Sequence, residues 1–100
     1  MNIQITSRKF RAKDSLKDYV KNELQTLKKI NDDILDANVI LSFTHLKDSI
    51  KTVEVQLKIP GKVLTAKDES DDFKKSVTKV VHKLEKQLKT VKSKRLARIK

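Results

Sequence analysis

The last third of the chain carries a row of lysines whose spacing suits binding to an anionic surface. These residues are Lys75, Lys79, Lys83, Lys86 and Lys89. Steps of three and four residues place side chains on one side of a helix. Residues 74–100 hold eleven Lys or Arg and one acid, whereas residues 1–73 have a net charge of only +1. Nearly all of the formal net charge of +11 lies on one segment, which favours a polyanion as partner: RNA, DNA or an anionic membrane surface.

An apolar side runs along the same segment. It consists of Phe73, Val77, Val80, Val81, Leu84, Leu88 and Val91. At about 100° per residue, these positions fall within an arc about 100° wide, which is the width of a core-facing stripe. Asp71 and Asp72 precede the first apolar residue, where a carboxylate can cap the free backbone N–H groups. The pattern predicts one long helix over residues 71–100, held by its apolar side.

The sequence offers little for catalysis or metal binding. His45 and His82 are far apart in sequence, and His82 falls among the lysines of the exposed arc. The chain has no cysteine and a single glycine, so it lacks thiolate ligands and a glycine-rich phosphate loop. The acids of residues 68–72 are interpreted as a solvated link and helix cap instead of a magnesium site. We therefore expect no enzyme, no metal, no cofactor and no small-molecule substrate.

Nothing in the sequence predicts a membrane span or an export signal. The longest strongly apolar run, residues 39–41, is far too short to cross a bilayer. Polar residues such as Asn2, Gln4 and Arg8 interrupt the beginning of the chain, where a signal segment would be apolar. We therefore expect a cytoplasmic protein.

The residues before the last helix alternate between strand and helix patterns. Strands are predicted at residues 2–8, 36–44, 50–59 and 62–67, and a first helix at residues 14–30. Residues 45–49 are expected to form a loop, Pro60-Gly61 a turn, and residues 68–72 an acidic link. The order predicts an α+β fold, a β-α-β-β-β-α two-layer sandwich with a four-stranded sheet and two helices on one face. We expect one domain over residues 1–92 and a basic C-terminal tail over residues 93–100.

The scarcity of acids on the last helix indicates that its lysines bind something. Lys75, Lys79 and Lys83 repel one another at four-residue steps, and an external anion would offset that repulsion. Phe10, Tyr19, Phe43 and Phe73 fall at positions that look core-facing, which leaves no clear platform for stacking bases. Binding through phosphate contacts and shape, as in folded RNA, is therefore expected.

Taken in order, these segments resemble the short ribosome hibernation-promoting factors. The resemblance covers residues 1–95 and is carried by "IQITSRKF", "DSLKDYVKNELQTLKKI", "DANVILSF", "VEVQLKIPGKVLTA" and "DDF…VTKVVHKLEKQLKTVK". Residues 83–88 are similar to the family's K-L-E-R-Q-L. The sequence departs from the family pattern at Lys13, Lys74 and Thr78, where Thr, Tyr and Asp are usual.

The resemblance implies binding to small-subunit rRNA in the decoding channel, over the sites of mRNA and tRNA, as a monomer on the ribosome. It implies RNA contacts by basic residues of both helices. Together, the charge pattern and the resemblance give the expected RNA-binding residues: Lys21, Lys28, Lys29, Lys75, Lys79, Lys83, Lys86, Lys89 and Lys92. Two alternatives remain open. One is a general double-stranded RNA- or DNA-binding module without ribosome specificity, and the other is a membrane-surface protein with a basic amphipathic helix.

Overall fold

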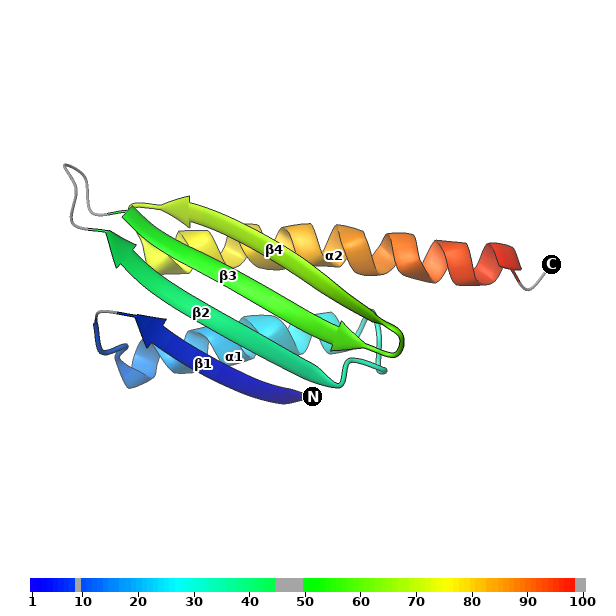
Figure 1. Cartoon of the computed structure of the whole chain (residues 1–100), viewed down its shortest axis with the longest axis horizontal. Coiled ribbons are helices and arrows are strands. Elements are labelled where there is room, and N and C mark those ends of the chain that lie inside the picture. The colour runs from blue at the N-terminus through cyan, green and yellow to red at the C-terminus, as the bar shows by residue number, and fades with distance from the viewer. Residues whose placement is uncertain (9, 45–49, 99–100) are drawn as a thin grey trace.

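The computed structural model describes residues 1–8, 10–44 and 50–98, with side chains up to Val91 except that of Thr44. The elements are β1 (Asn2–Arg8), α1 (Asp14–Lys28), β2 (Asp36–Thr44), β3 (Ile50–Ile59), β4 (Lys62–Ser70) and α2 (Phe73–Arg98) (Figure 1). This is the β-α-β-β-β-α order that the sequence predicts. The loop expected at residues 45–49 lies outside the described residues.

The four strands form one mixed sheet in the order β1-β2-β3-β4. β1 pairs with β2 in parallel, and the other two pairings are antiparallel. A parallel pair cannot be joined by a tight turn, so the chain between β1 and β2 crosses over through α1. The β3–β4 turn is tight, and Gly61 takes a φ of 76° there, a conformation that costs glycine little.

Both helices cover the same face of the sheet and lie side by side behind it in Figure 1. The core fills the space between the layers. Alternate strand residues such as Val39, Val53 and Val55 are at most 1% exposed, and the helices contribute Leu24 and Leu84, both fully buried. The predicted two-layer α+β sandwich is therefore confirmed.

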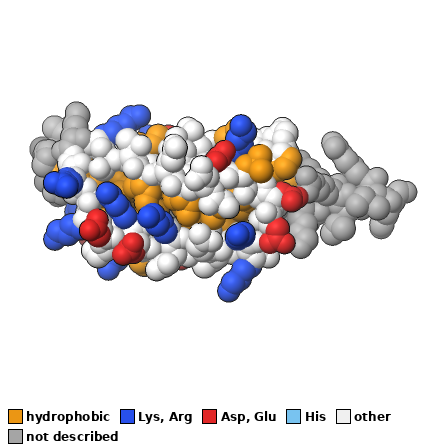
Figure 2. Space-filling view, turned by 90° about the horizontal axis from the view of Figure 1, so that it is seen from below, with side chains coloured by type: hydrophobic (Ala, Val, Ile, Leu, Met, Phe, Trp, Pro, Cys, Tyr) orange, Lys and Arg blue, Asp and Glu red, His pale blue; other side chains and the backbone are white. Residues whose placement is uncertain are grey.

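The predicted apolar stripe of the last helix forms its buried side. Six of its seven residues are buried, and Val91 is half-buried at the edge of the core. Of the four aromatic residues expected to face the core, Phe73 is buried, whereas Phe10, Tyr19 and Phe43 are only half-buried. Figure 2 shows hydrophobic side chains along a stripe on the side of β1 and α1, where the two layers meet.

Three boundaries differ from the sequence-based prediction. α1 ends at Lys28, because the next amide groups, those of Lys29 and Ile30, bond carbonyls only three residues back and the chain turns. The expected acidic link begins as strand: β4 continues to Ser70, which pairs with Lys51 of β3. Ladder pairing with β3 thus outweighs the low strand propensity of these polar residues. α2 begins at Phe73 and not at residue 71, its described part ends at Arg98, and residues 99–100 of the predicted helix lie outside the described residues.

Candidate nucleic-acid interface

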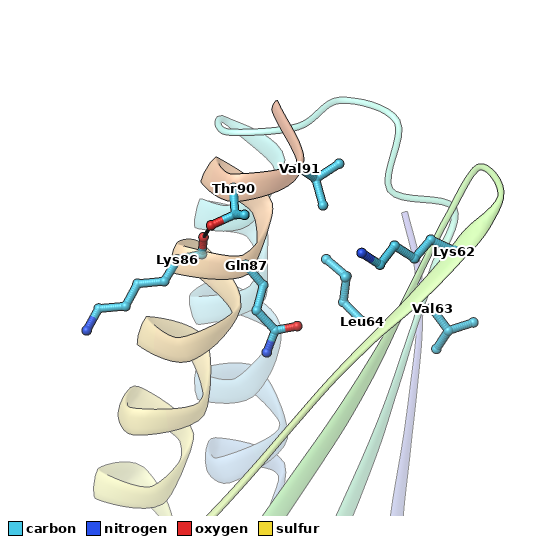
Figure 3. Close-up of a pocket in the computed structure, with 7 residues that line it drawn as sticks. All are labelled: Lys62, Val63, Leu64, Lys86, Gln87, Thr90 and Val91. Atoms are coloured by element: carbon cyan, nitrogen blue, oxygen red, sulfur yellow. Dashed lines mark hydrogen bonds between the residues drawn. The ribbon is translucent and has the colours of Figure 1, made fainter. Parts of the chain in front are cut away.

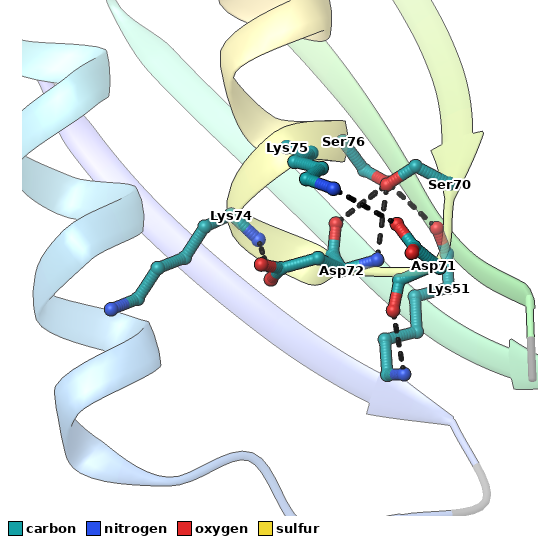
Figure 4. Close-up of polar contacts among 7 residues, drawn as sticks. All are labelled: Lys51, Ser70, Asp71, Asp72, Lys74, Lys75 and Ser76. Atoms are coloured by element: carbon teal, nitrogen blue, oxygen red, sulfur yellow. Dashed lines mark hydrogen bonds and ion pairs between the residues drawn. The ribbon is translucent and has the colours of Figure 1, made fainter.

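A set of short polar contacts fixes the beginning of α2 (Figure 4). The carboxylate of Asp72 accepts the backbone N–H of Lys74 at 2.9 Å, as expected of a helix N-cap. The ammonium of Lys51 donates to the carbonyl of Asp71 at 2.9 Å, which ties the cap to β3. The fully buried hydroxyl of Ser76 donates to the carbonyl of Lys51 at 2.8 Å. The first turn of α2 is therefore held against the end of the sheet.

Contacts on both flanks of α2 define its rotation about its own axis. On one flank, the hydroxyls of Tyr19 and Thr78 lie 2.9 Å apart and join α2 to α1. On the other flank, Lys83 donates to the carbonyl of Lys67, and Gln87 donates to the carbonyl of Thr65. The second pair of bonds satisfies backbone groups of the edge strand β4, which would otherwise be open to another chain. The side of α2 that faces away from the sheet is thereby determined.

That outward side carries the predicted lysines. At about 100° per residue, Lys75, Lys79 and Lys86 fall within an arc about 40° wide, opposite the buried side. All three are exposed. Lys89, also exposed, falls about 20° from Thr78 and so lies on the α1 flank. We call Lys75, Lys79, Lys86 and Lys89 the α2 lysine face.

Lys83 differs from its neighbours because its ammonium has partners inside the protein. It lies 3.2 Å from Asp68 and also donates to the carbonyl of Lys67 at 3.0 Å. Lys75 lies 3.4 Å from Asp71, with both side chains largely exposed. The protein's own carboxylates thus partly offset the repulsion expected among Lys75, Lys79 and Lys83. The sequence had led us to expect that an external anion alone would offset it.

The pKa of Asp68 is lowered in the folded protein, mainly by a backbone hydrogen bond and in part by its contact with Lys83. The backbone N–H of Glu69 donates to the Asp68 carboxylate at 2.9 Å, and this bond is the main cause that holds the pKa of Asp68 below its ordinary value of 3.8. Partial desolvation acts in the opposite direction, while the hydrogen bond and positive charge of Lys83 lower the pKa further. Asp68 therefore remains ionised beside Lys83 at neutral pH.

The structure divides the lysines predicted on the first helix. Tyr19 faces α2, and Lys21 and Lys28 lie about 160° and 180° from it around α1, so they point away from α2. Lys29 follows the helix directly. The two helices run in the same direction (Figure 1), and Lys29 and Lys89 are about equally far along the chain from Tyr19 and Thr78, which are in contact. The two lysines therefore lie at about the same level along the helices. Lys29 can thus extend the α2 lysine face, whereas Lys21 and Lys28 form a separate flank. The side chain of Lys92 lies outside the described part of the chain.

The uncovered face of the sheet contrasts with the helical face. Its rows, read from the strand register, mix polar groups with charges of both signs. In one row Glu54 lies opposite Lys67, and in another Asp36 lies opposite Lys58. Opposite charges on facing strands offset one another. The excess positive charge therefore lies on the helical layer.

A shallow groove between the β3–β4 hairpin and α2 brings one further cation, Lys62, near Lys86 of the α2 lysine face (Figure 3). It is lined by Lys62, Val63 and Leu64 of β4 and by Lys86, Gln87 and Val91 of α2. Sequence reasoning missed Lys62, since no local pattern relates a turn residue to a helix twenty-four positions later. Within the described residues, no group of His, Asp and Glu could hold a metal ion, and no helix is long and apolar enough to cross a membrane.

Comparison with known proteins places this architecture among ribosome-associated proteins. Residues 3–96 match the family described as Sigma 54 modulation protein / S30EA ribosomal protein. The chain is 29% identical to the ribosome hibernation promoting factor of Azotobacter vinelandii, over 98% of this chain and 89% of that protein. It is also 29% identical to the ribosome hibernation promotion factor of Deinococcus radiodurans, over 90% of this chain and 48% of that protein. The chain therefore spans about half the length of that second relative.

Solved structures agree with the sequence matches. A ribosomal subunit interface protein from Coxiella burnetii superposes with a TM-score of 0.85 at 31% identity, covering 93% of this chain and 99% of that one. The N-terminal domain of Thermus thermophilus Protein Y superposes with a TM-score of 0.81 at 29% identity, covering 91% of this chain and 99% of that domain.

Proposed function

Since the chain belongs to the Sigma 54 modulation protein / S30EA ribosomal protein family, the family of ribosome hibernation promoting factors, we propose that it binds small-subunit rRNA in the decoding channel. There it would occupy the sites of mRNA and tRNA and so inhibit translation. The inhibition is steric, because the domain and the mRNA–tRNA pair cannot share one channel. No reaction is catalysed.

The observation that carries this proposal is the difference in charge between the two faces of the molecule. On the α2 lysine face, Lys79, Lys86 and Lys89 have no ion pair with any described residue. On the sheet face, acids and bases alternate. Ammonium groups that lie outside an ion pair are available to replace the counterions of a phosphate backbone. The α2 lysine face, extended by Lys29, is therefore the proposed contact with rRNA.

Charge reversal on the lysine face tests the proposal. A Lys79→Glu, Lys86→Glu, Lys89→Glu variant should no longer co-sediment with small subunits and should no longer inhibit cell-free translation. The matched control is Arg8→Glu, Lys58→Glu, Lys67→Glu, which changes the net charge equally on the sheet face. Circular dichroism and a thermal melt establish that both variants fold. If the two variants bind small subunits to the same extent, the α2 lysine face is not the specific contact. If the first variant binds subunits but does not inhibit translation, steric occlusion is wrong.

Salt dependence gives a second measure of the same contacts. For duplex DNA the log–log slope of affinity against salt is about −0.9 per phosphate contact, so several contacts should cost 100-fold or more between low and moderate salt. The charge-reversed α2 variant should show a flatter slope than the sheet-face control. Equally tight binding to a free RNA duplex would favour the general nucleic-acid-binding alternative over a ribosome-specific factor.

A further inference from the structure

A second cationic site lies in the helical layer where the beginnings of α1 and α2 meet. It is a pocket of about 220 Å³. Arg11, Lys13 and Lys74 supply three positive charges, and Phe10, Leu16 and Phe73 supply apolar walls. These residues come from the β1–α1 connection, the first turn of α1 and the first turn of α2. The pocket is therefore a product of the tertiary fold and is distinct from the α2 lysine face.

The three cations of the pocket are exposed, and none has an ion pair with a described residue. The ammonium of Lys74 lies 5.6 Å from the centroid of the Tyr19 ring, and Figure 4 shows its side chain extending from the α2 cap toward α1. Three carboxylates are close in sequence: Asp14 begins α1, Asp72 accepts the backbone N–H of Lys74, and Asp71 is paired with Lys75 at 3.4 Å. The positive charges of the pocket thus outnumber the nearby acids that have no lysine partner.

The apolar part of the pocket rests on packed aromatic rings. The ring of Phe10 stacks on that of Phe73 with centroids 5.0 Å apart and planes 16° from parallel, and it lies 6.4 Å from the ring of Phe43. Phe10 is only half-buried, so part of this cluster faces the pocket. The volume is below the roughly 300–1,000 Å³ of pockets for drug-sized ligands. Such a pocket suits a small group with one apolar face and one anionic end.

We propose that this pocket binds one nucleotide of single-stranded RNA. Arg11, Lys13 and Lys74 contact its phosphate, and the nucleoside packs against Phe10 and Leu16. Contact between bases and aromatic side chains is largely independent of sequence, because every base has an apolar face. The proposal rests on the proposed binding to rRNA and adds a second anchor to it, one that holds an unpaired nucleotide while the α2 lysine face contacts backbone phosphates.

The variant that tests the pocket is Lys13→Thr combined with Lys74→Gln. Lys13 stands at the N-cap of α1, and its side chain caps no backbone N–H. A threonine at this position can accept one of those N–H groups, so the substitution should preserve or raise stability. A thermal melt of the double variant should show an unchanged or higher melting temperature, so that loss of binding is not attributed to unfolding. Lys58→Gln, on the sheet face, is the control.

Nuclear magnetic resonance titration of the full chain with uridine 5′-monophosphate measures the site directly. Amide signals of residues 11–16 and 73–74 should shift, and the double variant should raise the dissociation constant at least 10-fold while Lys58→Gln leaves it unchanged. Equal shifts with uridine would contradict the role of the phosphate, and equal shifts with inorganic phosphate would contradict the role of the nucleoside. An unchanged dissociation constant in the double variant would overturn the proposal.

Sedimentation with small subunits separates this proposal from the proposed function. If the wild-type chain binds subunits and the double variant binds equally well with an unchanged salt slope, the function stands and the pocket proposal is wrong. If the wild-type chain does not bind subunits, the proposed function is wrong, and the titration still decides whether the pocket takes a nucleotide. A salt slope flatter by about one in the double variant supports both.

Discussion

The ammonium of Lys83 lies 3.2 Å from the carboxylate of Asp68 and 3.0 Å from the carbonyl oxygen of Lys67, so one side chain joins α2 to the edge strand β4. Lys83 belongs by sequence to the same row as Lys79 and Lys86. Its contacts give it a structural role that those two lysines lack. A substitution at Lys83 is therefore expected to change stability as well as any interaction with RNA. Substitutions at Lys79 and Lys86 test RNA binding without that effect on stability.

Lys83→Gln should lower the free energy of unfolding by up to about 1 kcal/mol, the upper range for an exposed ion pair. Lys86→Gln should change it by no more than about 0.5 kcal/mol, since Lys86 has no ion pair with a described residue. Urea unfolding of the two variants measures the difference, and binding to small subunits should fall for Lys86→Gln. Equal stability of both variants would show that the Lys83 contacts contribute nothing measurable.

Acid should weaken the contact between α2 and β4 through Asp68. The pKa of Asp68 is lowered in the folded protein, so its contribution to stability is fully present above the ordinary value of 3.8 and is lost as pH falls through the folded pKa. Asp68→Asn should therefore be less stable than the wild type at pH 6, with the gap closing below about pH 4. Thermal melts across this range test the sign, and a gap that widens in acid would contradict it.

The buried side of α2 should determine stability and its lysine face should not. Leu84 is fully buried, and Leu84→Ala should cost about 2–5 kcal/mol through the cavity it leaves. Lys79 is exposed, and Lys79→Ala should cost no more than about 0.5 kcal/mol. Chemical unfolding of the two variants tests the assignment of faces. Similar losses of stability in both variants would mean that the buried and exposed sides of α2 are assigned wrongly.

Ser76 should matter more than its size suggests. Its hydroxyl is fully buried, donates to the carbonyl of Lys51 and lies 2.8 Å from the hydroxyl of Ser70. Ser76→Ala should cost about 1–3 kcal/mol, because the groups it bonds lose a partner in a place with little water. Ser15→Ala, at an exposed position of α1, is the control in the same thermal melt. A cost as small as that of the control would show that water replaces the hydroxyl.

The periodicity of the sequence was enough to predict most of the fold. Alternation over residues 50–59 and the seven-residue apolar stripe of the last helix are local patterns, and burial on one side is the only arrangement that suits them. Strand ends were less predictable. The polar residues Asp68, Glu69 and Ser70 have little preference for a strand, and only pairing with β3 recruits them.

The sequence by itself determined the order of the elements, the buried and exposed sides of the last helix, and the concentration of charge there, because each depends on residues close together in the chain. Only the tertiary structure decided which lysines share a surface. It gave Lys83 a carboxylate partner on β4, turned Lys21 away from α2, and brought Lys13 beside Lys74. These relations depend on how each helix is rotated against the sheet and its neighbour, and long-range packing sets that rotation in a way that no local spacing encodes.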